Sequence, residues 1–419
     1  MPILTLALKS LLNRRFTALL TLLSIALSVA LLLGVERVRS ETRTSFSSTI
    51  SGTDLIVGAR SGPVQLLLYS VFRIGNATNN ISWQSYQDIA AHPKVAWTVP
   101  ISLGDSHRGF RVLGTTPGYF DHYRYARDRR LEFAAGARFD DLFDAVLGAE
   151  VADALGYGLG DEIVIAHGAG DVRFARHDDK PFRVAGVLKR TGTPVDRTVH
   201  VSLEAIEAVH LGWQGGAPMP GLTPTAAQVR AMDLTPEAIT AVLVGLKSKI
   251  AAFAVQRYVN DYREEPLLAV LPGVALGELW SLIGVAEGAL LIVSGFVVLV
   301  GLIGMLTALL IGLNERRREM AILRSVGARP AQVLALIIGE AAFLTLIGML
   351  LGIALLSGLL ALGQPLIESR LGLFIGIGAL SPHEWLLMAT VLAAGLLVGL
   401  VPGWRAYRMS LADGLSIRV

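Results

Sequence analysis

Four long runs of apolar residues constrain this chain more than any other feature. They cover residues 16–35, 289–313, 334–362 and 385–401, and Glu340 is the only ionisable side chain within them. About 20 consecutive apolar residues are enough to span the hydrocarbon core of a bilayer. A mean hydropathy of +0.55, with 53% hydrophobic residues, agrees with this class. We therefore expect four transmembrane helices.

The first run could also be a cleaved signal peptide, because Lys9, Arg14 and Arg15 precede it as a basic segment. Its apolar part is too long for a signal peptide, however, and no small-residue cleavage site precedes the charged residues that begin at Glu36. We interpret it as an uncleaved anchor.

Basic residues orient the four helices. They cluster before the first run, between the second and third runs, and after the fourth, and such residues are retained on the cytoplasmic side. Both termini are then cytoplasmic. The predicted division is a cytoplasmic amphipathic helix (1–15), a first span (16–36), an extracytoplasmic domain (37–279), a second span with an outward extension (280–313), a cytoplasmic segment (314–330), a third span (331–362), an outer loop (363–384), a fourth span (385–403) and a cytoplasmic tail (404–419).

The region between the first two spans mixes helical and strand periodicity, which predicts a large α+β extracytoplasmic domain. A helix is expected at 81–91, and strands at 146–148, 162–166, 182–188, 198–202 and 241–244. The Gly- and Pro-rich residues 212–225 predict a loop or an internal boundary. The amphipathic residues 276–287 continue into the second span without a helix breaker, so one helix there could carry motion from one side of the membrane to the other.

Several kinds of chemistry are excluded or disfavoured. The chain has no cysteine, which excludes thiol-based metal or redox chemistry. Its net charge is only +3 and the basic residues lie at membrane boundaries, so nucleic-acid binding is not expected. No G-x-x-x-x-G-K-[ST] motif is present, so we expect a protein that is not itself an ATPase.

Two stretches resemble fragments of a metal site or a hydrolytic triad. They are His177-Asp178-Asp179 and Asp105-Ser106-His107, and neither has a partner at helix or strand spacing. We interpret His177-Asp178-Asp179 as a solvated loop, and we assign no catalytic, cofactor-binding or metal-binding residue in either stretch.

The segment between the second and third spans contains five arginines within residues 314–330. They could serve only to orient the helices. Helical spacing, however, places Met320, Leu323 and Gly327 on one face, with Ile322 and Val326 beside them. Gly327 is expected to end this helix, and Pro330 to prevent its continuation. We find no partner for the apolar stripe within the chain and expect another protein to bury it.

The sequence E-R-R-R-E-M-A-I-L-R-S-V-G-A at 315–328 resembles the coupling-helix segment of the FtsX-like ABC transporter permeases, a group that includes macrolide exporters and lipoprotein-releasing permeases. The third span, with Glu340-Ala341 and two later glycines, is similar to the same family. So are F-R-V-A-G-V-L at 182–188 and P-G-W-R-A-Y-R at 402–408. Leu411 and Gly414 depart from the family pattern, which makes the C-terminal match the weaker one.

The resemblance implies a permease subunit in the bacterial inner membrane that docks on a separate ATPase dimer, which binds the ATP and Mg²⁺. A second permease copy or paralogue, a periplasmic partner protein and membrane lipids are further expected partners. The permease would either export or extract a substrate or only transmit motion. The docking residues carried over are Glu315, Arg316, Arg317, Arg318, Glu319, Met320, Ile322, Leu323, Arg324 and Gly327.

The spans contain two further groups of candidate residues. The small-residue pairs Gly348/Gly352 and Gly395/Gly399 allow close helix packing, either within the chain or in a dimer. Glu340 is either a functional intramembrane charge or the partner of an arginine from 314–330 or from the C-terminal segment. We favour the pairing, because no second intramembrane acid or base is present for a proton relay.

A different class of function is a membrane-anchored extracytoplasmic sensor or enzyme that has no ATPase partner. It would require an active-site constellation or a cytoplasmic output domain. The sequence offers neither, so we prefer the permease.

Overall fold

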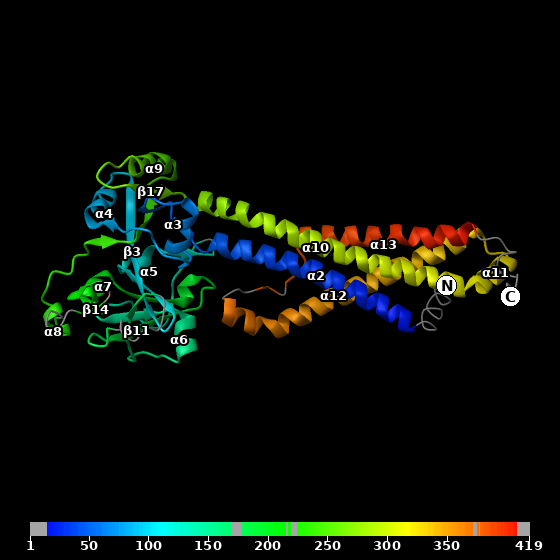
Figure 1. The fold of residues 1–419 in the computed structure, drawn as a ribbon, viewed down its shortest axis with the longest axis horizontal. Helices are drawn as coiled ribbons and strands as arrows, with labels where there is room; N and C mark the ends of the chain where they lie inside the picture. The colour runs from blue at the N-terminus through cyan, green and yellow to red at the C-terminus, as the bar shows by residue number, and fades with distance from the viewer. Residues whose placement is uncertain are drawn as a thin grey trace. The chain divides into compact units, whose positions relative to one another are not determined.

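The computed structural model describes residues 15–126, 128–168, 177–214, 217–218, 224–371, 375–376 and 378–408. The chain divides into a helical unit, made of residues 1–41, 284–368 and 374–419, and an α/β unit, made of residues 42–283 and 369–373. Figure 1 shows the elements of both. The predicted fold class is confirmed, since a large mixed α/β domain lies between the first and second of four long apolar helices.

The helical unit contains α2 (Arg15–Ser48), α10 (Pro272–Glu315), α12 (Pro330–Leu371) and α13 (Pro382–Arg408), with the short α11 (Arg317–Ser325) between α10 and α12. The four long helices are each long and apolar enough to cross a membrane. They bury a common core, to which α2 contributes Val29 and Leu33, α10 Met305, α12 Leu344 and α13 Met388. Figure 1 shows these helices running side by side.

The helices extend beyond the predicted spans. Helix α2 continues to Ser48 rather than ending at residue 36, and α12 continues to Leu371 through Pro365, into the predicted outer loop. A proline removes one backbone donor, which a long helix supported by neighbouring helices tolerates. The predicted amphipathic helix at 1–15 falls almost entirely outside the described residues, as do the tail beyond residue 408 and much of 212–225.

The α/β unit is built on one large mixed sheet. Its strands, in spatial order, are β17 (Leu267–Val270), β1 (Leu55–Ala59), β16 (Ala241–Leu246), β3 (Val95–His107), β4 (Phe110–Thr115), β12 (Thr198–Ser202), β8 (Asp144–Leu147), β11 (Phe182–Leu188) and β7 (Phe133–Gly136). β10 (Ala166–His167) pairs with β3, and β9 (Glu162–Ile163) pairs with β11. The β4–β12 and β8–β11 pairs are parallel, and the other pairs of this sheet are antiparallel.

Short ladders and helices complete the unit. The ladders are β2 (Ile81–Ser82) with β15 (Ala238–Ile239), β5 (Arg124–Tyr125) with β6 (Arg129–Arg130), and β13 (Trp213–Gln214) with β14 (Ala217–Pro218). The helices are α3 (Pro63–Ser70), α4 (Trp83–Ala90), α5 (Gly118–His122), α6 (Ala149–Leu155), α7 (Leu203–His210), α8 (Ala226–Val229) and α9 (Ala252–Asn260), with 3₁₀ turns at Pro194–Arg197 and Lys249–Ala251.

Local chemistry explains most of these elements. Along β11, Phe182, Val184 and Leu188 are buried while Arg183 is exposed, which is the alternation of a strand with one face on the core. Ser202 caps α7, where its hydroxyl accepts a hydrogen bond from the Ala205 N–H at 3.0 Å. The strand predicted at 162–166 is two strands, because the backbone changes its partner from β11 to β3.

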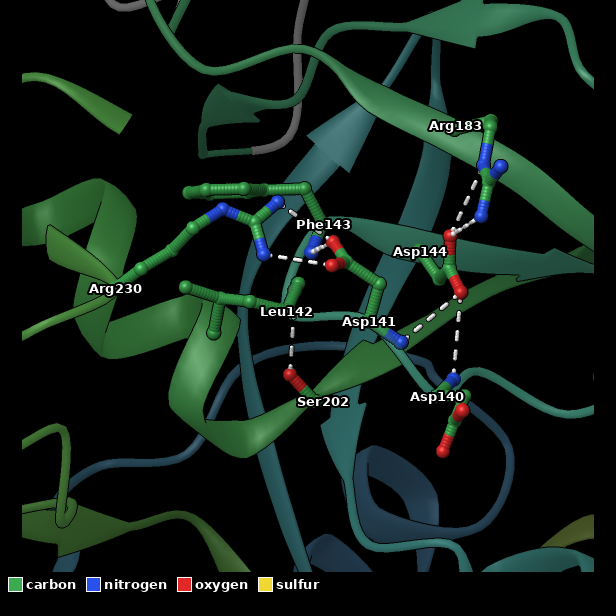
Figure 2. A network of polar contacts seen from close by, with 8 residues as sticks. All are labelled: Asp140, Asp141, Leu142, Phe143, Asp144, Arg183, Ser202 and Arg230. Carbon is green, nitrogen blue, oxygen red and sulfur yellow. Dashed lines mark hydrogen bonds and ion pairs between the residues drawn. The ribbon is translucent and has the colours of Figure 1, made fainter. Parts of the chain in front are cut away.

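A polar network fixes the loop before β8 (Figure 2). The buried Asp144 carboxylate accepts hydrogen bonds from the Arg183 guanidinium at 2.9 Å and from the backbone N–H of Asp141 at 3.1 Å. Asp141 in turn accepts two hydrogen bonds from Arg230, at 2.6 and 2.8 Å, just after α8. The Arg230 guanidinium lies 5.3 Å from the centre of the Phe143 ring. The network therefore joins α8 to the start of β8.

Asp144→Ala is expected to destabilise the α/β unit by about 1–3 kcal/mol, because it leaves backbone N–H groups near β8 without their acceptor. The lower midpoint of the unfolding transition would measure this loss. Asp153→Ala is the matched control, since the Asp153 side chain is 70% exposed and its ion pair is with Arg190, whose side chain is 39% exposed. Equal effects of the two substitutions would contradict the role given to Asp144.

Candidate functional site

Helix α11 forms most of the arginine-rich segment and connects the long apolar helices α10 and α12 along the chain. It ends as the sequence predicts: Gly327 adopts a left-handed conformation with φ of +102°. The Ala328 N–H donates to the Leu323 carbonyl and the Gly327 N–H to the Arg324 carbonyl, which is the hydrogen-bond pattern of a Schellman cap. Pro330 is then the first residue of α12, a position where its missing N–H costs nothing.

The sequence analysis expected the apolar stripe of α11 to have no partner within the chain. In the structure, part of this stripe is buried by the chain itself. Met320 and Ala321 are each only 5% exposed. Met320 belongs to a hydrophobic cluster that also includes residues from the end of α10, the start of α12 and the end of α13. We name it the inner cluster, and its members are Leu313, Met320, Val333, Leu336, Ile337 and Ala406. Leu323 packs against this cluster. The expectation that Met320 lacks a partner within the chain is therefore wrong. A Met320→Asp variant would damage the chain's own packing.

The exposed apolar side chains of this segment are Ile322 and Val326, which the sequence analysis placed beside the predicted stripe. Ile322 is 57% exposed and Val326 82% exposed. Together with the exposed Arg318 they are spaced four residues apart, so they follow one side of the helix. We name Arg318, Ile322 and Val326 the outer face of α11. Among the other predicted docking residues, Glu315, Arg317, Glu319 and Gly327 are also exposed, and Arg324 is half-buried.

Arg316 is the exception among the arginines, because it is buried. Its guanidinium lies 3.1 Å from the Glu340 carboxylate of α12 and 3.0 Å from that of Glu319. The Glu340 contact is the substantial one, since the Glu319 side chain is 58% exposed. This contact agrees with the interpretation that Glu340 pairs with an arginine. It fixes the start of α11 to α12.

The four candidate glycines pack within the chain. A Cβ at Gly348 or Gly352 would approach α2, and at Gly352 it would lie 2.8 Å from the Ala26 carbonyl oxygen. A Cβ at Gly395 would lie 2.3 Å from the Thr345 hydroxyl of α12, and Gly399 faces Ala341 of the same helix. Of the two predicted uses, the structure supports close packing inside one chain. Because α2 and α12 cover these glycines within the chain, none of the four is exposed for the other predicted use, a dimer contact.

Sequence reasoning missed a group of charges at the other end of the helical unit. Arg37, only 8% exposed, donates to Glu384 at 2.9 Å and to two carbonyls in the segment before α13. Glu36 pairs with Arg39 at 2.8 Å, and Glu287 of α10 lies 3.8 Å from Arg39. The sequence signal was Glu36-Arg37-Val38-Arg39, which we used only to mark the end of the first span.

Helix α10 also belongs to the core of the α/β unit. Ala275 and Leu276 are buried there, and Trp280 packs against the same cluster. The Trp280 ring lies 5.8 Å from that of Phe46 at the end of α2, and Phe46 stacks on Phe72 at 4.5 Å. One uninterrupted helix of 44 residues therefore connects a packed core of the α/β unit to Glu315, two residues before the start of α11.

Comparison with known families gives two matches that together cover most of the chain. The MacB-like periplasmic core domain matches residues 18–262, which is more than half of the chain, and the FtsX-like permease C-terminal domain matches residues 291–411. The chain belongs to the FtsX-like ABC transporter permeases. It is a multi-pass membrane protein with a periplasmic domain of the MacB type, formed by the α/β unit, and permeases of this family work with ATPase subunits.

Relatives of the permease include two exporters and an uncharacterised permease. The pyoverdine export ATP-binding/permease protein PvdT of Pseudomonas aeruginosa is 31% identical over 127 residues, which cover 30% of the permease and 18% of that protein. The protein of the same name from Pseudomonas savastanoi is 24% identical over 337 residues, or 77% and 46% of the two chains. An uncharacterized ABC transporter permease of Methanocaldococcus jannaschii is 25% identical over 230 residues, or 54% and 51%. The permease thus spans about half of these relatives or less.

Proposed function

We propose that the permease couples ATP binding and hydrolysis in a separate cytoplasmic ATPase to motion of its periplasmic domain in a bacterial inner membrane. The observation that carries this proposal is the two-sided character of α11. Its outer face presents Ile322 and Val326 to solvent, while Met320 is buried in the inner cluster. An exposed apolar pair beside arginines fits a partner's groove with an acidic rim.

The attachments of α11 support its use in coupling. The Arg316–Glu340 pair and the inner cluster join it to three of the four long helices. A partner that displaces α11 would therefore displace the ends of α10, α12 and α13 with it. Close packing favours such rigid-body movement over local deformation.

Helix α10 provides the route for this motion. Its 44 residues correspond to a length of about 66 Å at 1.5 Å per residue. The α10 residues Ala275 and Leu276 are embedded in the core of the periplasmic domain. We propose that this helix transmits force across the membrane and that any substrate is handled on the periplasmic side. The names of the relatives, which include pyoverdine and macrolide export, support transport by this class of machine.

A second permease chain completes the proposed assembly. The candidate glycines are already covered, so the second chain needs another surface. Helix α10 is the least covered of the four spans, with 22% of its most apolar window buried against 33–44% for the others. Its exposed side chains include Val293, Phe296 and Val300. We propose that α10 faces the second chain.

The docking proposal predicts that Ile322→Asp and Val326→Asp each weaken retention of the ATPase by at least tenfold, because each buries an unpaired carboxylate in the proposed interface. The measurement is co-purification from native membranes of the tagged full-length permease. The retained protein is identified as an ATPase of the ABC type by mass spectrometry and quantified against the permease.

Ile250→Asp is the matched control, because Ile250 is 91% exposed in the periplasmic domain and the same charge is introduced there. This variant should retain the ATPase at the wild-type level. Equal retention by Ile322→Asp, Val326→Asp and the wild-type chain would refute docking through the outer face. If the wild-type chain retains no such ATPase, the coupling proposal as a whole is refuted.

A further inference from the structure

Four metal-ligating side chains converge in the periplasmic domain, away from α11. Asp105, His167, His177 and His210 each bring one ligand atom to a group in which all these atoms lie within 4.8 Å of one another. Two of these residues come from the stretches Asp105-Ser106-His107 and His177-Asp178-Asp179, for which the sequence analysis found no partner. The structure instead places Asp105 and His177 together and buries both.

A different structural feature of the domain positions each of the four residues. A register shift between Leu103 and Ser106 in the β3–β4 ladder forms a bulge that includes Asp105. His167 of β10 lies directly opposite Asp105 in the β3–β10 ladder. His210 is the last residue of α7, whose start is fixed by the Ser202 cap. The His177 backbone N–H donates to the Ile165 carbonyl at 3.0 Å.

The distances approach those of a tetrahedral site. The Asp105 Oδ1 atom lies 3.1 Å from His167 Nδ1 and 3.4 Å from His210 Nε2. Zinc bonds of about 2.0–2.1 Å in a tetrahedron place neighbouring ligand atoms about 3.3 Å apart. Two of the distances between ligand atoms are thus already close to the required length. Since all ligand atoms lie within 4.8 Å of one another, each remaining distance must shorten by about 1.5 Å at most.

Several buried polar atoms of the group have no hydrogen-bond partner among the described residues. The His177 side chain is fully buried, and neither of its ring nitrogens is hydrogen-bonded. Asp105 Oδ1 and His210 Nε2 lie close together but do not have hydrogen-bond geometry. Burying such atoms without partners destabilises the folded domain. A cation among them would remove this destabilisation.

Burial changes the titration of this group. Burial, with the nearby His210 ring, lowers the pKa of His177 to about 4. A metal-free alternative is that protonated His210 neutralises Asp105, because that carboxylate raises the pKa of His210 against the opposing effect of burial. This alternative still leaves both ring nitrogens of the buried His177 without a hydrogen-bond partner in the part of the chain that the structure describes.

We propose that Asp105, His167, His177 and His210 bind one Zn²⁺ ion in the periplasmic domain. Three imidazoles and one carboxylate are a donor set that zinc accepts in tetrahedral geometry, whereas Mg²⁺ and Ca²⁺ prefer oxygen ligands. Four protein ligands leave no open position, so the ion is structural or regulatory. It enters from the side of His167 and His210, whose side chains are 30% and 29% exposed.

The zinc site goes beyond the proposed coupling function and does not depend on it. The ion would join β3, β10 and the end of α7 through ligands that are distant in the sequence. Metal binding to the folded state alone raises stability with metal concentration. The Trp213 ring, 4.2 Å from that of His177, would form part of the shell around the ligands and report on binding by its fluorescence.

The test uses the full-length permease in detergent, stripped of metal with a chelator and then titrated with ZnCl₂. We expect one zinc per chain by elemental analysis after gel filtration, a higher thermal midpoint with zinc, and no such change with MgCl₂. Cobalt(II) should give the intense visible bands of tetrahedral coordination. His177→Ala and Asp105→Asn should each bind zinc at least tenfold more weakly.

His92→Ala is the matched control, because His92 is a histidine of the same domain outside the cluster, packed against Tyr258. It should bind zinc as the wild-type chain does. Two ligand variants are used in case one of them unfolds more easily. A variant whose thermal midpoint without metal equals that of the wild-type chain reports on zinc binding alone. The proposal is overturned if the wild-type chain fails to retain zinc, or if both ligand variants bind zinc as tightly as the wild-type chain. Neither outcome bears on ATPase retention, so the two proposals can fail separately.

Discussion

Arg316→Ala is expected to destabilise the permease by about 3–5 kcal/mol, because it leaves the Glu340 carboxylate without its partner in an apolar surrounding. The two side chains are 7% and 13% exposed, and their atoms lie 3.1 Å apart. The same change disconnects the start of α11 from α12. The midpoint of denaturant-induced unfolding in detergent, together with the amount of protein inserted in membranes, measures the effect.

Two variants separate the buried pair from charge alone. Arg317→Ala removes an exposed arginine next in sequence and should shift the midpoint little. The double variant Arg316→Ala/Glu340→Ala removes both charges and should recover part of the stability, since no bare carboxylate remains. A double variant as unstable as the sum of its single variants would show that the pair does not interact.

The sequence predicts those features that depend on neighbouring residues. The apolar runs predict the four helices because span length depends only on local hydropathy. The end of α11 follows from Gly327, whose left-handed conformation suits glycine, and from Pro330. Strands such as β11 and β12 follow from local alternation or β-branched runs. The family resemblance added what the residues alone left open, namely the ATPase partner.

Burial by distant segments is what the sequence could not provide. Met320 was expected to be free, but its environment comes from the start of α12 and from Ala406 near the end of α13. The spacing of the glycines indicated close packing without identifying α2 and α12 as the partners. The metal cluster shows the same limit. Asp105 and His210 meet only because β3 and α7 are neighbours in the folded domain.

Gly352→Leu is expected to destabilise the helical unit by about 3 kcal/mol or more, because the close contact of α12 with α2 leaves no room for a side chain. A Cβ at this position would lie 2.8 Å from the Ala26 carbonyl oxygen and 2.9 Å from the Val29 Cβ atom. One of these neighbours is backbone, so the two helices themselves must separate. The amount of inserted protein and its thermal midpoint in detergent would both fall.

Gly358→Leu is the matched control on the same helix. No heavy atom lies within 4 Å of a Cβ built at Gly358, so the substitution meets open space. It should be neutral or slightly stabilising, because leucine has a higher helix propensity than glycine by roughly 1 kcal/mol. A normal thermal midpoint for Gly352→Leu would mean that α2 and α12 do not approach closely at this glycine.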